Sequence, residues 1–585
     1  MLLETPESIE TPAARPHCIT HDGRHLFTWH HPARLSVRRG AAVVLCAPIG
    51  SEYICAYRVW RILAERLADI GFDVFRFDCE GTGDSSGDIE EPDRLGAWLR
   101  NIECVVTEAQ ALTRSREVAL LGLRIGATLA LEVAVARGGV DRLVLWSPFG
   151  SGRSYVRELK AFARISRKDY VAPEGPDILA AGYTLPAEIA TALEALDLNS
   201  VSIAPAPNVL VVEHDERLPD PTIGQRLESL GSRVVCVRPC GTGAMLEQPA
   251  RSKVPDAALD AITSWLADWP SRHRSSAGTP ERGADNPYLA QGPGYQERGV
   301  RFGPAGRLFG ILTIPTLVDS MKPAVIFLNT GIEYRVGPHR LYVPVARELA
   351  GQGHAVLRYD VGGIGDSAPP PGAPENLAYP EHALDDAREA IAFIRKQAPG
   401  RRIVLTGLCS GGWHAFCAAR DGLQVDAIVC VNAPLYLRDG PPAMPRPELA
   451  IGPYRRALQD PARWRTALRR MSAYTCFARF VGAYLKRKIS AIVRAALGGH
   501  LLDGLARDLN AISARGITSL FVFSSGDTGL EYFRLHGSPA LRRRQLRKRI
   551  RLVVVNDAGH TFSPPGAQHA LRRLVLDFVA RDSAP

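Results

Sequence analysis

One cysteine occupies a position at which a thiol can act as a nucleophile. A predicted strand and a predicted helix are joined at 406–416 by TGLCSGGWHAF, in which glycines stand two residues before and two residues after Cys409. Side chains at those two positions would not fit in so tight a strand-to-helix turn. A thiol at a helix N-terminus beside a histidine ionises readily, so we predict that Cys409 is the nucleophile. Two alternatives stay open: Ser410 as nucleophile, which would need a glycine at Leu408, or a buried structural cysteine.

Two further polar residues follow in the order that such a nucleophile requires, an acid and then a base. Asp527, within FVFSSGDTGLEY, comes directly after a predicted strand, and His560, within VVVNDAGHTF, lies on the loop after the last predicted strand. We predict that His560 relays the proton and that Asp527 orients its imidazole. Asp557 and Glu531 are the fallback acids. Either Asp527 or His560 taken singly could be an ordinary loop residue.

Acyl chemistry also needs two backbone N–H groups that face the developing oxyanion. Ser410 directly follows the nucleophile and is predicted to supply one of them. The second is expected from the loop NTGIEY at 329–334, from either Gly331 or Ile332.

The chain contains an internal repeat that is as long as a domain. Residues 41–88 and 323–367 share a pattern of hydrophobic and glycine positions, and RFDCEGTGDS at 76–85 recurs as RYDVGGIGDS at 358–367. A repeat unit of this length indicates two whole domains and excludes a solenoid of short units.

Each copy alternates short β-branched runs with stretches of helical periodicity, which is typical of a mostly parallel sheet with crossover helices. In the second copy we expect strands near 324–328, 355–360, 402–408, 427–433, 519–525 and 551–557. The first copy shows AVVLCA, DVFRFD, VALLGL, RLVLWS, NVLVVE and RVVCVR in the same order. We therefore predict two α/β domains at 15–270 and 297–582, joined at 271–296 by a linker rich in Pro, Gly and Ser.

Three stretches resemble a known group of enzymes. GIEYRVGPHR at 331–340, RYDVGGIGDS at 358–367 and the GLC of the elbow are similar to the Cys-type hydrolases that accompany exosortase and exopolysaccharide gene clusters. The elbow also resembles that of dienelactone hydrolase, which has cysteine as its nucleophile. The resemblance extends over 297–582 at the level of the fold and is sharp only over 331–367 and the elbow. It implies an α/β-hydrolase fold and ester or thioester chemistry for the second copy. Because the first copy repeats the same landmarks, we expect two tandem α/β-hydrolase domains.

Three basic residues of the resembling stretch need a separate interpretation. Arg335, His339 and Arg340 could bind an anionic group of the substrate, or they could form structural hydrogen bonds to nearby loops. We favour the structural role.

The first copy lacks both reactive groups. Its elbow reads LLGLRIGATLA, with Arg124 in the place of Cys409, and arginine stays protonated and cannot attack a carbonyl carbon. Its last loop reads CGTGAMLEQP, with Ala244 in the place of His560. An acidic candidate, Asp215, remains. These two losses predict a degenerate domain, a pseudo-enzyme.

The role of the degenerate domain is open between two interpretations. It could be a scaffold that packs against the active domain, or its pocket could bind a ligand whose carboxylate or phosphate pairs with Arg124. His214 could serve as a base, but without a nucleophile it has nothing to activate.

The second copy carries an insertion at about 436–510, which we expect to form a helical cap over the pocket. Within it, 455–494 contains eleven Lys and Arg and one acid, Asp460, so this segment accounts for the net charge of +10. Its basic amphipathic pattern could dock on a membrane surface or an acidic carrier protein, or could be a solvated face of the cap. The pattern contains neither an element that would read a nucleic-acid groove nor a platform on which bases would stack, which argues against nucleic-acid binding.

The remaining composition narrows the function further. The eleven cysteines are irregularly spaced, no apolar run could span a bilayer, and the N-terminal region lacks a signal pattern, which together predict a cytoplasmic protein. No motif indicates a metal or an organic cofactor. We expect a Cys-dependent hydrolase or acyltransferase for a small-molecule ester or thioester, possibly carrier-bound. The alternative is a non-catalytic protein that binds a carbohydrate or lipid precursor on a hydrolase scaffold.

Overall fold

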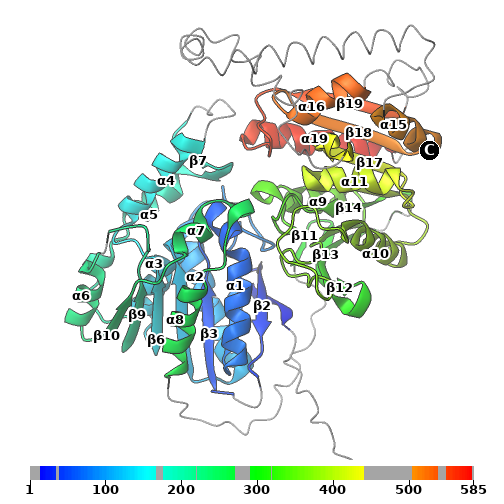
Figure 1. Cartoon of the computed structure of the whole chain (residues 1–585). Coiled ribbons are helices and arrows are strands. Elements are labelled where there is room, and N and C mark those ends of the chain that lie inside the picture. The colour runs from blue at the N-terminus through cyan, green and yellow to red at the C-terminus, as the bar shows by residue number, and fades with distance from the viewer. Residues whose placement is uncertain are drawn as a thin grey trace, which may run out of the picture.

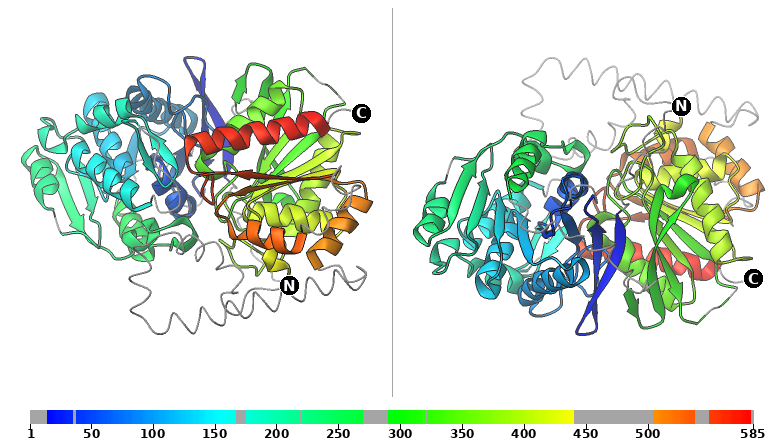
Figure 2. Two further views of the ribbon diagram at one scale, coloured as in Figure 1. Left: turned by 90° about the horizontal axis from the view of Figure 1, so that it is seen from above. Right: turned by 90° about the horizontal axis from the view of Figure 1, so that it is seen from below.

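The chain folds into two halves that lie side by side, each built around its own sheet (Figures 1 and 2). The computed structural model describes residues 14–582, apart from 35–37, 167–174, 219, 270–289, 318, 320, 440–503 and 538–548. The predicted fold class is confirmed, because both halves are mostly parallel sheets flanked by helices. The predicted basic cap lies outside the described residues.

The first sheet has the strand order β1-β2-β4-β3-β5-β6-β9-β10. Its strands are β1 (Arg15–His21), β2 (Arg24–His31), β3 (Ala41–Cys46), β4 (Asp73–Phe77), β5 (Glu117–Leu123), β6 (Arg142–Trp146), β9 (Asn208–Val212) and β10 (Arg233–Val237). Only the hairpin β1–β2 and the β2–β4 pair are antiparallel. The helices that cover it include α1 (Ser51–Asp69), α2 (Arg94–Thr113), α3 (Ile125–Arg137) and α8 (Asp256–Ala267).

The second sheet repeats this order as β11-β12-β13-β15-β14-β16-β17-β18-β19. Its strands are β11 (Ala290–Gly292), β12 (Tyr295–Phe302), β13 (Leu308–Pro315), β14 (Ala324–Leu328), β15 (Val356–Tyr359), β16 (Ile403–Leu408), β17 (Ala427–Val431), β18 (Thr518–Ser524) and β19 (Ile550–Val555). Its flanking helices include α9 (Tyr342–Gly351), α10 (Ala383–Gln397), α11 (Ser410–Arg420), α15 (Gly504–Ala514) and α19 (Pro565–Asp582).

Burial on both faces explains why the central strands were visible in the sequence. Every residue of β3, β14, β16 and β17 is buried, because helices cover both sides of a parallel sheet. The outermost antiparallel strands, β1 and β11, are only partly buried, and no such run marks them in the sequence. As a correction to the predicted linker, 271–296, the second sheet already begins at Ala290.

The first half also contains a small subdomain that the sequence did not predict. It consists of α4 (Gly152–Ser166), the hairpin of β7 (Ile178–Ala180) and β8 (Tyr183–Leu185), and α5 (Ala187–Glu194). Its apolar side chains join the core of the first sheet. In Figure 1, α4 and β7 lie at the end of the first half beside the second.

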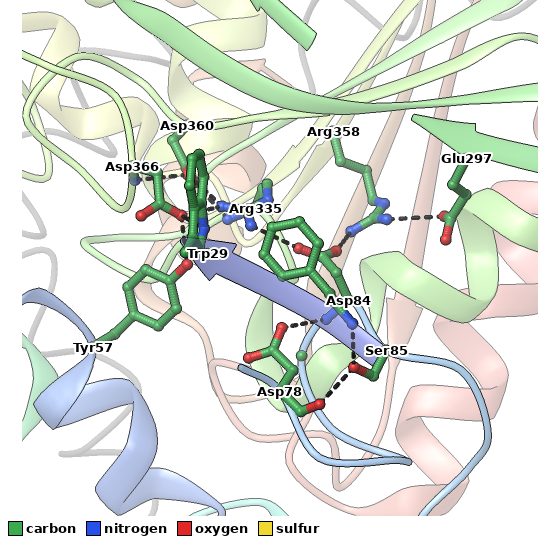
Figure 3. A network of polar contacts seen from close by, with 12 residues as sticks. Trp29, Tyr57, Asp78, Asp84, Ser85, Glu297, Arg335, Arg358, Asp360 and Asp366 are labelled. Atoms are coloured by element: carbon green, nitrogen blue, oxygen red, sulfur yellow. Dashed lines mark hydrogen bonds and ion pairs between the residues drawn. The ribbon is translucent and has the colours of Figure 1, made fainter. Parts of the chain in front are cut away.

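A buried network of charged residues joins the two halves (Figure 3). Asp366 of the second half accepts hydrogen bonds from Trp29 (3.1 Å) and from Tyr57 (2.5 Å) of the first. It also forms ion pairs of 2.8 Å with Arg76 across the boundary and with Arg335 of its own half. Burial raises the pKa of Asp366, but these two arginines outweigh burial and hold the pKa far below its ordinary value.

The network is reciprocal, because equivalent residues of the two repeats exchange partners. Arg76 of the first half pairs with Asp366 of the second, and Arg358 of the second half pairs with Asp84 of the first at 2.6 Å. A small apolar cluster beside the network is shared in the same way, between Phe27 and Trp29 of β2 and Phe309 and Ile311 of β13. Subunits of a two-fold symmetric dimer meet through equivalent residues in this manner.

The GTGDS loop of the first half is held mainly through its backbone. Arg340 donates to the carbonyl oxygens of Gly83, Ser85 and Gly87 at 2.6–3.0 Å, and Arg347 donates to those of Asp84 and Ser85. These contacts agree with the structural role that we favoured for Arg335 and Arg340, because both arginines bind the other half of the chain. Within the described residues, every helix is too short or too polar to cross a membrane.

Candidate active site

The strand-to-helix turn between β16 and α11 holds Cys409 in a strained conformation. Its backbone has φ 55° and ψ −114°, a combination that residues other than glycine rarely adopt. A Cβ on Gly407 would lie 2.5 Å from the backbone of Gly411, and a Cβ on Gly411 would lie 2.6 Å from the carbonyl oxygen of Leu328. Both glycines are therefore required by close backbone contact, as their spacing predicted.

His560 and Asp527 come together beside this turn. The Nδ1 atom of His560 lies 2.6 Å from Oδ2 of Asp527, and the other carboxylate oxygen accepts the backbone N–H of Gly529 at 2.7 Å. Asp527 is 6% exposed, whereas the side chain of His560 is half-exposed. The fallback acids are placed differently: Glu531 pairs with Arg534, and Asp557 is an exposed residue on the loop.

The protonation of His560 reflects both of its neighbours. Burial lowers its pKa, but hydrogen bonds to Asp527 and to the thiol of Cys409, together with the charges of these two groups, raise it to about 10. The imidazole is therefore protonated at neutral pH and places a positive charge beside the thiol. Cys409 also stands at the N-terminus of α11, where the helix dipole stabilises negative charge.

Ser410 serves to fix the neighbouring loop. Its hydroxyl accepts the backbone N–H of Gly331 at 2.8 Å and donates to the carbonyl oxygen of Asn329 at 3.3 Å. The residue is 1% exposed. These contacts weaken the case for Ser410 as a nucleophile, and they occupy the N–H of Gly331, one of the two candidates for the second oxyanion donor.

Three residues at the site had no signal in the sequence. The hydroxyl of Tyr379 lies 3.8 Å from Sγ of Cys409, and the hydroxyl of Tyr342 accepts the N–H of Leu408 at 3.0 Å. Asn432 donates to the carbonyl oxygen of His560 at 2.6 Å, and its Oδ1 accepts the N–H of Ser524, so it ties the histidine loop to β18. Each acts across the fold, and no short motif marks such contacts.

The first half preserves the shape of the turn with Arg124 in the place of Cys409. Arg124 has φ 59° and ψ −122°, close to the values of Cys409, and the flanking glycines are again in close backbone contact. Its guanidinium pairs with Glu52 at 2.8 Å and with Glu158 at 2.5 Å, and it lies over the ring of Phe149 at 4.2 Å. A group held in this way has no nucleophilic role.

The other degenerate positions are also occupied by structural contacts. Ala244 lies in α7 (Thr242–Leu246), and the carboxylate of Asp215 accepts the N–H groups of Gly241 and Gly243 at 2.6 and 3.0 Å. Burial and the charges of two nearby arginines lower the pKa of His214 to about 4, although Asp215 beside it opposes this. His214 is therefore neutral at neutral pH.

The fold and both turns define two α/β-hydrolase domains. A family model described as serine aminopeptidase, S33, matches residues 41–174 and 323–462, so the chain is similar to that family once in each half. The description names serine enzymes, whereas Cys409 and Arg124 stand at the two turns of this chain.

Several solved structures are similar to the chain. Est1E from Butyrivibrio proteoclasticus with bound ferulic acid is 19% identical, covers 43% of this chain and 96% of its own, and has a TM-score of 0.33. An esterase from Pyrococcus furiosus is 14% identical, with coverages of 50% and 92% and a TM-score of 0.31. An α/β serine hydrolase without lid from Xanthomonas campestris is 16% identical, with coverages of 45% and 99% and a TM-score of 0.29. The search of curated proteins returned no match.

Proposed function

We propose that the protein is a cysteine-dependent hydrolase or acyltransferase that acts on an ester or thioester in its second domain. The observation that carries this proposal is the grouping of Cys409 at the strained turn with His560, whose imidazole is held 2.6 Å from Asp527. The first domain runs no acyl chemistry, because Arg124 and Ala244 stand at its two reactive positions.

The reaction follows from these positions. The thiolate of Cys409 attacks the carbonyl carbon, the bond to the leaving alcohol or thiol breaks, and the leaving group takes its proton from His560. The resulting thioester on Cys409 is then attacked by water or by an acceptor, whose proton passes to His560 as the thiolate leaves. Asp527 keeps the imidazole oriented throughout both steps.

The oxyanion would be held by backbone donors near the turn. The N–H of Ser410 is one, and that of Ile332 is the second, since the N–H of Gly331 is bound by the Ser410 hydroxyl. The hydroxyl of Tyr379, 3.8 Å from the thiol, is placed to contact the group bound there.

A carrier-bound acyl group is the substrate form that we propose. The basic segment 455–494 would dock an acidic carrier protein and bring a thioester to Cys409. An anionic membrane surface would be attracted to the same charges, so it is the competing partner for that segment.

The test is covalent capture of the acyl-enzyme by the full chain. Incubation with acyl thioesters of short and medium chain length, followed by acid quenching and intact-mass measurement, should show one acyl adduct, which peptide mapping assigns to Cys409. Cys409→Ala should abolish the adduct and the turnover, whereas Cys236→Ala, which removes an exposed thiol elsewhere, should change neither. Turnover that survives in Cys409→Ala would overturn the nucleophile assignment.

A further inference from the structure

Tyr379 approaches the nucleophile from the side of the sheet opposite to the histidine. It lies on the loop between β15 and α10, and its hydroxyl is 3.8 Å from Sγ of Cys409. In the sheet, β15 and β14 lie on one side of β16, whereas β18 and β19, which precede Asp527 and His560, lie on the other. The loop after β14, 329–334, is the one from which an oxyanion donor is expected. The hydroxyl of Tyr379 therefore reaches Cys409 from the oxyanion side.

The loop that carries Tyr379 is anchored on both sides of this residue. The N–H of Asn376 donates to the carbonyl oxygen of Gly363 at 2.9 Å, and the ring of His382 donates to that of Gly362 at 3.0 Å. Both carbonyl groups belong to the turn that follows β15. A donor whose position is fixed before the reaction needs no reorganisation when charge develops on the substrate. The two anchors thus hold the Tyr379 hydroxyl in a defined place.

The phenol of Tyr379 is a neutral hydrogen-bond donor at physiological pH. Partial burial and the charge of Cys409 both raise the pKa of Tyr379 above its ordinary value of 10, so the hydroxyl keeps its proton. Its ring packs edge-on against that of His414 on α11, with 6.0 Å between the ring centroids. The side chain is 43% exposed and its contact with Cys409 is open to solvent, so a substrate carbonyl group can reach both residues.

One of the backbone donors expected for the oxyanion is already in use. The N–H of Gly331 donates to the hydroxyl of Ser410 at 2.8 Å, so it cannot also point at a substrate oxygen. The backbone N–H groups of Ser410 and Ile332 remain as candidates. Donors aimed at the developing charge are usually the largest contribution to acyl-transfer catalysis. A hydroxyl on the same side of the nucleophile would replace the donor that Gly331 does not supply.

We propose that Tyr379 is a catalytic residue whose hydroxyl donates a hydrogen bond to the carbonyl oxygen of the substrate as Cys409 attacks. This role rests on the function proposed above and adds a residue to it. As the S–C bond forms, the π electron pair of the carbonyl group moves onto its oxygen, and the phenol stabilises that charge while keeping its own proton. When the pair returns, the bond to the leaving group breaks and His560 supplies the proton. The same hydrogen bond forms again when the thioester on Cys409 is attacked.

Tyr379→Phe removes the hydroxyl and keeps the ring, so two reactions of Cys409 can be compared in the full chain. Acylation by an acyl thioester builds an oxyanion, whereas alkylation by iodoacetamide displaces iodide from a saturated carbon and builds none. Both rates are measured at one pH by acid quenching and intact mass. Acylation should slow about 10²- to 10³-fold, as expected for the loss of one oxyanion donor, and alkylation should not slow.

Tyr359→Phe is the matched control for the loss of a tyrosine hydroxyl. Tyr359 is the last residue of β15, and its hydroxyl has no hydrogen-bond partner in the part of the chain that the structure describes. The first copy has Phe77 at the aligned position, so the fold accepts phenylalanine there. This variant should leave both rates unchanged.

The outcomes separate this role from the proposed function. If acylation and alkylation slow equally in Tyr379→Phe, the hydroxyl supports the thiol itself, and if neither slows, it has no role. Either result overturns the proposal, as does an equal slowing of acylation in Tyr359→Phe. If the unchanged chain is alkylated at Cys409 but never acylated, the proposed function fails, and the role of Tyr379 fails with it.

Discussion

Replacing Asp366 by asparagine should weaken the junction between the two halves more than any surface change. Asp366 receives only donors: Trp29, Tyr57, Arg76 and Arg335. Asparagine has nearly the same shape, but it lacks the charge, and its amide presents two N–H groups to neighbours that are themselves donors. The substitution therefore removes electrostatic complementarity while leaving the packing in place.

The magnitude follows from burial. The side chains of Asp366 and Arg76 are each 3% exposed, and breaking such a buried pair costs about 3–5 kcal/mol because a charge is left in the interior without its partner. Glu375→Gln is the matched control, since Glu375 also pairs across the boundary, with Arg58 and Arg61, but is 26% exposed. An exposed pair of this kind is worth about 0–1 kcal/mol.

Equilibrium urea unfolding of the full chain, followed by tryptophan fluorescence and circular dichroism, compares the two variants. Because a two-domain chain need not unfold in one step, the early transition in which the halves separate is the quantity to compare. Its midpoint should fall much further in Asp366→Asn. The low pKa of Asp366 keeps it charged in the folded state, and an unfolded aspartate is charged above about pH 4, so the difference should hold from pH 5 to 8. Equal shifts in the two variants would refute the role of this network.

Three further outcomes are expected. Because Asp527 and Cys409 raise the pKa of His560 to about 10, the imidazole NMR signals of His560 should titrate near pH 10, whereas in Asp527→Asn the midpoint should fall toward the ordinary value of about 6.5; an unchanged midpoint contradicts the pairing. Asn432→Ser should lower kcat at unchanged KM, while Ser147→Ala, at the corresponding turn of the first domain, should not affect kcat. Reversing Arg465, Arg469 and Arg470 to Glu should raise KM for a carrier-bound thioester and not for a free one, and an equal effect on both would exclude carrier docking.

The sequence predicted the elements whose properties are local. Central strands appear as unbroken apolar runs because both faces are covered, and Gly407 is required by its close contact with the backbone of Gly411 within the same turn. Cys409, Asp527 and His560 follow the parallel strands β16, β18 and β19, so their order along the chain predicted that they lie at the same edge of the sheet.

Sequence patterns did not predict the residues whose contacts join distant segments of the chain. Asn432 supports His560 from the end of a different strand, and Tyr379 approaches Cys409 from a loop without any motif. Residues of both halves line a cavity at Arg124. Aligning the two copies could therefore show that Arg124 stands in the place of Cys409, but it could not show that a cavity lies there.

The reciprocal junction constrains some equivalent positions of the two copies more than others. The shared RFD and RYD runs and the GDS loops supply Arg76 and Asp84 to the second half and receive Arg358 and Asp366 from it. A change at Asp84 removes the partner of Arg358 across the boundary and leaves it only Glu297 of its own half, and a change at Asp366 removes the ion-pair partner of the buried Arg76. No such partner constrains position 124 from across the boundary, because Arg124 pairs within its own half. The junction therefore constrains the GDS loops of both halves and places no such constraint on the turn at Arg124.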